Sequence, residues 1–106
     1  MRITTGISLI AIMASMTMTA AFAQSSGADV YKTKCQSCHG AAGVPSAGMA
    51  KAMGVKPATD PAVKSQTEAK MIAVTTNGAG KMPAFKGKLT DAQIKDSVAF
   101  FRTFAK

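Results

Sequence analysis

KCQSCHG, residues 34–40, is the stretch of sequence that decides the fold. It contains both cysteines of the chain, Cys35 and Cys38, and its only histidine, His39. Thiolate and imidazole groups bind soft and borderline metals, and thiols also form covalent bonds. Four interpretations follow: a redox dithiol, part of a zinc site, a small disulfide, or the attachment point of a larger cofactor.

Three of these interpretations fit the surrounding sequence poorly. A thioredoxin-type dithiol begins a helix that follows a strand, whereas this pair lies near the end of a predicted helix, where the helix dipole disfavours a thiolate. A structural zinc ion takes four ligands, and the chain has only three cysteines and histidines, two of them adjacent. A disulfide between Cys35 and Cys38 would close a very small loop and stabilise little.

Covalent haem explains the whole cluster. Two cysteines separated by two residues match the two vinyl groups of haem, and the histidine directly after them becomes the proximal ligand of the iron. The motif therefore predicts one haem c, attached through Cys35 and Cys38, with His39 as its first axial ligand. A large apolar macrocycle would also supply the core that so short a chain lacks.

The first 23 residues follow the three-part plan of a secretory signal. The charge-free stretch between Arg2 and Asp29 is largely apolar and contains the small-residue sequence AFA at 21–23. We therefore expect residues 1–23 to be a cleaved signal peptide and residues 24–106 to form one domain in the periplasm, since c-type haem is attached outside the cytoplasm. The alternative is an uncleaved membrane anchor, because the uncharged run almost reaches the length that spans a bilayer.

The predicted domain is strongly basic. All but Arg2 of the 13 lysines and arginines lie in it, against 5 aspartates and glutamates. This imbalance favours a partner with an acidic surface. We expect no nucleic-acid partner, because an exported protein rarely meets one and because Arg102 is the only arginine after the signal.

Helical periodicity, capping residues and glycine or proline breaks divide the domain into helices and loops, and no stretch alternates over the length of a strand. Ser26, Ser65 and Thr90 are each followed three residues later by an acidic residue or glutamine, which is typical of a helix start. The predicted helices span residues 28–38, 47–53, 65–76 and 91–104, and residues 55–63 are predicted to be irregular. The fold class is therefore all-α, with three to four short helices.

The second axial ligand cannot be another histidine of this chain, and methionine is the usual alternative. Four methionines follow the predicted signal: Met49, Met53, Met71 and Met82. The first three lie on predicted helices, where core packing is the ordinary role. Met82 lies in the loop NGAGKMPAF, whose glycines let the backbone approach a flat ligand and whose Pro83 stiffens the chain after the sulfur. Met82 is therefore the predicted second ligand.

The pattern GxxxYxxxCxxCHG, the KMPAF loop and the aromatic C-terminal helix together resemble the class I cytochromes c of bacteria, which are soluble and carry one haem. The resemblance covers residues 27–105. It implies that the N- and C-terminal helices cross beside the haem, with Gly27 and Tyr31 packed against Val98 and Phe100. Ser97 departs from the family, because many relatives carry a larger apolar residue there, and this predicts a looser crossing.

The resemblance also implies a function. Iron held by both His39 and Met82 has no vacant position, so we expect a one-electron carrier rather than an enzyme. We also expect the protein to be a monomer. Its partners would be redox proteins with acidic docking surfaces, attracted by a basic rim of lysines on the methionine loop: Lys81, Lys86 and Lys88.

Some points stay open at the level of sequence. Relatives often use a proline carbonyl to accept the N–H of the proximal histidine, and Pro45 is the nearest candidate here. The domain would alternatively be a haem subunit of a larger oxidoreductase. A third possibility is a ligand-binding or peroxidase-like haem protein, if the methionine dissociates.

Overall fold

The structure, a computed structural model, describes residues 26–106, so the predicted signal peptide, residues 1–23, lies outside the described residues. In chain order the elements are α1 (Gly27–Val30), the π-helical turn η1 (Tyr31–Cys35), α2 (Gln36–His39), α3 (Ala47–Met53), α4 (Pro61–Lys64), α5 (Glu68–Asn77) and α6 (Asp91–Thr103). Within residues 26–106 the only β-bridges are two isolated pairs, Ala79 with Met82 and Lys86 with Leu89. The prediction of an all-α fold is confirmed.

The first helical segment runs without a break through α1, η1 and α2. Ser26 caps its start, as the sequence predicted: the hydroxyl oxygen accepts a hydrogen bond from the N–H of Asp29 (3.2 Å). In η1 the N–H of Gln36 bonds to the carbonyl of Tyr31, five residues before it. Such wide turns occur often at functional sites, and this one ends at Cys35.

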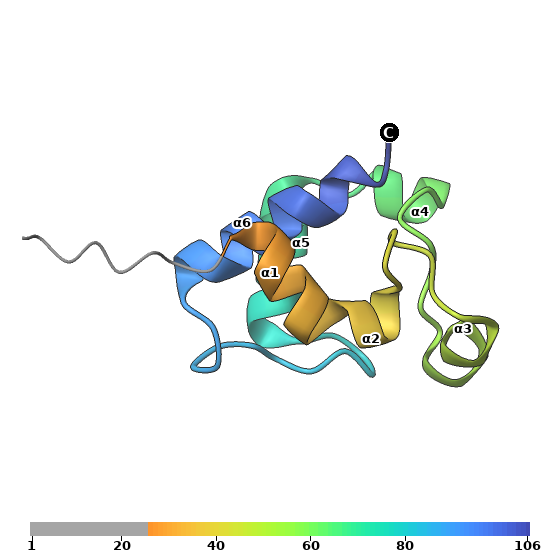
Figure 1. Cartoon of the computed structure of the whole chain (residues 1–106), viewed down its shortest axis with the longest axis horizontal. Coiled ribbons are helices and arrows are strands. Elements are labelled where there is room, and N and C mark those ends of the chain that lie inside the picture. The colour runs from red at the N-terminus through yellow and green to blue at the C-terminus, as the bar shows by residue number, and fades with distance from the viewer. Residues whose placement is uncertain (1–25) are drawn as a thin grey trace, which may run out of the picture.

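α1 and α6 cross in direct contact (Figure 1). Gly27 permits the close approach, because a β-carbon there would lie 2.2 Å from the backbone oxygen of Asp96. One turn later the ring of Tyr31 packs against Phe100 and Phe104, with ring centroids 5.4 and 5.5 Å apart. The crossing of the terminal helices is confirmed, as is the packing of Tyr31 on Phe100, and the atoms nearest to a β-carbon at Gly27 belong to Asp96.

The helix before the methionine loop starts later than predicted. The sequence placed a capping pair at Ser65 and Glu68, but the N-cap of α5 is Thr67, whose hydroxyl accepts from the N–H of Lys70 (3.1 Å). Ser65 instead ends α4, a short helix that begins inside the segment predicted to be irregular. Asp60 before Pro61 is itself a helix-start signal, which the prediction overlooked because it counted the prolines only as breakers.

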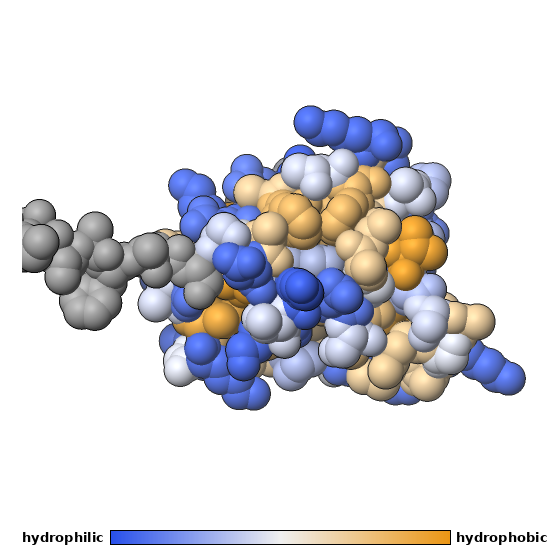
Figure 2. Space-filling view, in the orientation of Figure 1, coloured by the Kyte–Doolittle hydropathy of each residue, from blue (hydrophilic) through white to orange (hydrophobic). Residues whose placement is uncertain are grey.

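The other helix bounds agree closely with the sequence. α3 begins after the N-cap Ser46 and ends at Gly54, which has φ 67°. The predicted capping box of Thr90 and Gln93 opens α6. In the part of the chain that the structure describes, no helix has the length and apolar character needed to cross a membrane. Figure 2 shows hydrophilic side chains around an apolar area over the C-terminal half of α6.

Candidate functional site

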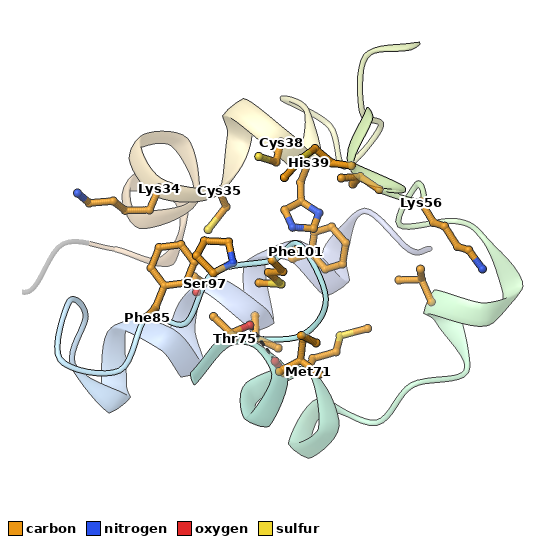
Figure 3. Close-up of a pocket in the computed structure, with 18 of the residues that line it drawn as sticks. Lys34, Cys35, Cys38, His39, Lys56, Met71, Thr75, Phe85, Ser97 and Phe101 are labelled. Atoms are coloured by element: carbon orange, nitrogen blue, oxygen red, sulfur yellow. Dashed lines mark hydrogen bonds between the residues drawn. The ribbon is translucent and has the colours of Figure 1, made fainter. Parts of the chain in front are cut away.

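A cavity of about 340 Å³ opens between the first helical segment, α5, α6 and the loops that follow α3 and α5. Its volume lies in the range of pockets that hold cofactors and small molecules. Figure 3 shows Cys35, Cys38 and His39 on one side of the cavity and Met71 on the other. Met82 also lines the cavity, so all four residues of the predicted site are brought together.

The two cysteines are half-buried on the first helical segment and are not joined in a disulfide. Burial raises the pKa of Cys35 to about 11, and the nearby Cys38 acts in the same direction. A group with this pKa is a thiol at neutral pH, whereas a thiol oxidoreductase needs a thiolate. Within residues 26–106 no three His, Cys, Asp or Glu side chains come together as a metal site. The geometry therefore favours neither the dithiol nor the zinc interpretation.

His39 projects from the end of α2 into the cavity, edge-on to Phe101, with ring centroids 5.3 Å apart (Figure 3). Burial lowers its pKa, so the imidazole is neutral, which is the form that binds a metal. Its Nδ1 is buried and has no hydrogen-bond partner, the single such side-chain atom in residues 26–106. Pro45, the candidate acceptor from the sequence, therefore makes no hydrogen bond to this atom in the structure.

Three of the four candidate methionines line the cavity, and Met49 does not. Met71 is buried, and its Sδ accepts a hydrogen bond from the guanidinium of Arg102 (3.6 Å). Met53 is the last residue of α3. Helical spacing alone marked Met53 and Met71 as core residues, and it could not show that the space they face is the cavity.

Met82 lies in a tight turn after α5. The turn is closed by two backbone hydrogen bonds, from the N–H of Ala79 to the carbonyl of Met82 (3.1 Å) and from the N–H of Met82 to the carbonyl of Ala79 (2.9 Å). Gly80 has φ 57°, a conformation that favours glycine. The backbone that carries the Met82 sulfur is thus held in one conformation.

The hydroxyl groups on the cavity wall are satisfied by the backbone. The Thr75 hydroxyl donates to the carbonyl of Met71 (2.8 Å), and the Ser97 hydroxyl donates to that of Ile94 (2.9 Å). Both side chains are buried. Because neither hydroxyl needs a partner in the cavity, the wall can face an apolar ligand without leaving polar groups unpaired.

The lysines at the cavity differ from those that the sequence suggested. Of Lys81, Lys86 and Lys88, only Lys81 lines the cavity, and Lys34 and Lys56 line it as well. Figure 3 shows Lys34 and Lys56 pointing outward at its two sides. The prediction grouped lysines by their nearness to Met82 in the sequence, but lysines from two other segments meet at the same cavity.

This set of residues fits a covalently bound haem. A neutral imidazole that lines the cavity lies on the same helical segment as two thiols, and thioether sulfurs line the same apolar space. Haem attachment requires the two thiols, and axial ligation requires nitrogen or sulfur donors such as these. The fold and the cavity together define a small helical protein built around a covalently attached macrocycle.

Comparison with known proteins gives the same result. The family model described as "Cytochrome C oxidase, cbb3-type, subunit III" matches residues 22–101. A cytochrome c6 from Leptolyngbya boryana is 43% identical over 75 residues, which cover 71% of this chain and 84% of that protein. The solved structure of the KustC0563 c-type cytochrome superposes with a TM-score of 0.69 at 27% identity, covering 77% of this chain and all of that one.

The chain therefore belongs to this family of monohaem c-type cytochromes. Its haem c is attached covalently through the CxxC motif of Cys35 and Cys38, and the protein is an electron carrier rather than an enzyme. The fold, the cofactor and the class of function predicted from the sequence are confirmed. Axial ligation by His39 and Met82, the bounds of the signal peptide and the periplasmic location stay predictions.

Proposed function

We propose that this protein transfers single electrons between redox proteins outside the cytoplasm, with His39 and Met82 as the axial ligands of its haem iron. When bound, the haem supplies a one-electron redox centre. The observation that carries the proposal is the convergence of both cysteines, the only histidine and the loop methionine on one cavity. Two axial ligands from the protein leave no position for a substrate, which favours electron transfer over chemistry at the metal.

Met82 is favoured over Met71 by the surroundings of the two sulfurs. The Met71 sulfur already accepts a hydrogen bond from Arg102, whereas the Met82 sulfur has no hydrogen bond within residues 26–106. The Met82 backbone is closely packed as well, because a β-carbon at Gly78 would lie 2.9 Å from the Met82 carbonyl oxygen. A fixed backbone with an available sulfur suits a ligand that must keep its position in both oxidation states.

Two contacts restrain His39, one through the backbone of the next residue and one from helix α6. The Tyr31 hydroxyl donates to the carbonyl of Gly40 (2.6 Å) and so fixes the backbone directly after His39. Phe101 of α6 packs against the imidazole ring. These contacts limit the movement of the imidazole, which favours a geometry that changes little when an electron is gained or lost.

The partner surface that we propose is acidic. The chain has a formal net charge of +8, and the cavity is lined by Lys34, Lys56 and Lys81 but by no aspartate or glutamate. Such a charge distribution steers an acidic partner toward the cavity and speeds association more than it tightens the complex. We place the encounter in the periplasm, because residues 1–23 have the pattern of an export signal.

The relatives support two alternatives: a separate electron carrier and a subunit of a larger oxidoreductase. The chain spans 84% of a cytochrome c6, which supports a separate carrier. The family model is described as an oxidase subunit, which supports the alternative of a haem subunit within a larger oxidoreductase. The mass of the protein recovered from its native host distinguishes the separate carrier from the oxidoreductase subunit. A free chain that begins at residue 24 supports the carrier, and a chain that retains residues 1–23 and co-purifies with other subunits supports the alternative.

The test of the proposed function is the visible spectrum of the exported protein, recorded oxidised and reduced and again after acid–acetone extraction. We expect a c-type spectrum that stays with the polypeptide, together with a sulfur-to-iron charge-transfer band in the oxidised form. A c-type spectrum without that band, with rapid binding of cyanide at neutral pH, would instead mean that the iron has a labile or absent methionine ligand.

A further inference from the structure

We propose that Lys81 is a positioning residue for the methionine ligand, acting by joining the Met82 turn to the end of α3. The Lys81 ammonium donates a hydrogen bond to the backbone carbonyl of Ala52, 29 residues away in the sequence (2.7 Å). This inference rests on the proposed role of Met82, and it concerns what keeps Met82 in place rather than which residue binds the iron.

The exposed carbonyl of Ala52 is available for such a partner. Ala52 lies in the last turn of α3, where carbonyls have no partner within the helix, and the C-cap N–H of Gly54 bonds to Ala50 instead. No backbone N–H within residues 26–106 bonds to Ala52, so the Lys81 ammonium satisfies it. A positive charge at this end of a helix is also favoured by the helix dipole.

α3 has few other contacts that hold it against the domain. None of its residues is buried, and its main contact with another helix is with α2. Figure 1 shows α3 at the outer edge of the fold, with the turn after α5 reaching toward it. One side-chain hydrogen bond therefore carries more weight here than it would between two well-packed elements.

The position of Lys81 in the turn makes it suited to this role. It directly precedes Met82 and follows Gly80, inside the turn that the Ala79–Met82 backbone bonds close. Met53, directly after Ala52, and Met82, directly after Lys81, both line the cavity. The hydrogen bond thus joins two walls of the cavity, and without it the α3 wall and the Met82 turn are free to separate.

The experiment compares the holoprotein with Lys81→Gln, Lys81→Arg and Lys86→Gln variants. Lys86→Gln is the matched control, because it removes the same charge from the same loop and the Lys86 side chain makes no hydrogen bond within residues 26–106. Added imidazole serves as the probe of methionine dissociation, and hydrogen exchange of residues 47–56 probes the α3 wall directly.

We expect Lys81→Gln to bind imidazole about fivefold more tightly than the wild type and to exchange amides of residues 47–56 about fivefold faster. The glutamine amide is uncharged and one bond shorter than the lysine side chain, whereas Lys81→Arg keeps a charged donor with the reach of lysine. Lys81→Arg should therefore stay close to the wild type, and so should Lys86→Gln. If Lys81→Gln and Lys86→Gln behave alike in both measurements, the effect is one of charge and the positioning role is wrong.

The two readouts separate this inference from the proposed ligand. If Met82→Ala retains the sulfur-to-iron band, Met82 is not the ligand, but faster exchange at residues 47–56 in Lys81→Gln still supports the link between the turn and α3. If the band depends on Met82 and exchange at residues 47–56 is unchanged in Lys81→Gln, the link fails while the ligand stands.

Discussion

Replacing Gly27 by alanine tests the crossing of α1 and α6, on which the packing of the domain depends. A β-carbon at this position would lie 2.2 Å from the backbone oxygen of Asp96 and 2.6 Å from its carbonyl carbon. Ordinary contact begins at 3.4 Å, so α1 must move away from α6 by about 1.2 Å. The obstacle is backbone in the middle of a 13-residue helix, which cannot rotate aside as a side chain does.

The expected magnitude follows from two opposing terms. Overpacking of this kind costs up to about 3 kcal/mol, while replacing glycine by alanine in a helix gains at most about 1 kcal/mol. We therefore expect Gly27→Ala to lower the free energy of unfolding by about 2 kcal/mol. Separation of the helices also shifts Tyr31 away from Phe100, so the loss should not be recovered by a small local adjustment.

Guanidinium-induced unfolding of the holoprotein, followed by far-ultraviolet circular dichroism, measures this difference. Gly48→Ala is the matched control, because Gly48 lies inside α3 and a β-carbon there meets nothing within 4 Å. It should be neutral or stabilise the protein by up to about 1 kcal/mol. If Gly27→Ala unfolds at the same denaturant concentration as Gly48→Ala, the close approach of α1 and α6 is not what makes glycine necessary at residue 27.

Three further predictions concern the site and its support. Met82→Ala should abolish the sulfur-to-iron charge-transfer band and lower the reduction potential, whereas Met53→Leu should keep both; a band that survives in Met82→Ala would assign the ligand to another methionine. His39→Ala should prevent stable holoprotein from accumulating, as measured by covalent haem per polypeptide, and a normal yield of low-spin protein would remove His39 from its role. Tyr31→Phe loses the hydrogen bond to Gly40 and should cost about 1–2 kcal/mol at neutral pH. Burial raises the pKa of Tyr31 from 10.0 to about 12, so the stability that its neutral hydroxyl contributes is complete below pH 10 and is lost as the pH rises to 12. The stability gap between wild type and Tyr31→Phe, followed by unfolding at each pH, should therefore narrow between pH 10 and 12, and a constant gap would contradict the burial argument.

Local features were predicted well wherever the chemistry lies within a few neighbouring residues. Ser26 and Thr90 cap their helices, and Gly54 ends α3 in the left-handed conformation, because each of these effects depends on backbone groups three or four residues away. The error at Ser65 has the same origin. Ser65 and Thr67 are both good N-caps, and the presence of α4 decided that Ser65 ends one helix while Thr67 begins the next.

The candidate site also combines features that neighbouring residues determine with features that they do not. Two cysteines and a histidine within five residues determine the cofactor by themselves, because the spacing of the haem vinyl groups must be met by a continuous stretch of chain. The choice among the methionines is not local. Arg102 of α6 reaches the sulfur of Met71 in α5 across 31 residues of sequence, and no pattern within either helix reveals that contact.

The sequence by itself determined that this protein carries a covalent haem in an all-helical domain, because attachment motif, helix caps and breakers are properties of short segments. Only the tertiary structure decided which lysines reach the cavity and which contact joins the Met82 turn to α3. Lys34, Lys56 and Lys81 come from three segments that the fold brings to one cavity, and the bond from Lys81 to Ala52 joins residues far apart in the chain. Contacts of this kind depend on where whole elements pack, which is set by the burial of apolar surface over the entire domain rather than by neighbouring residues.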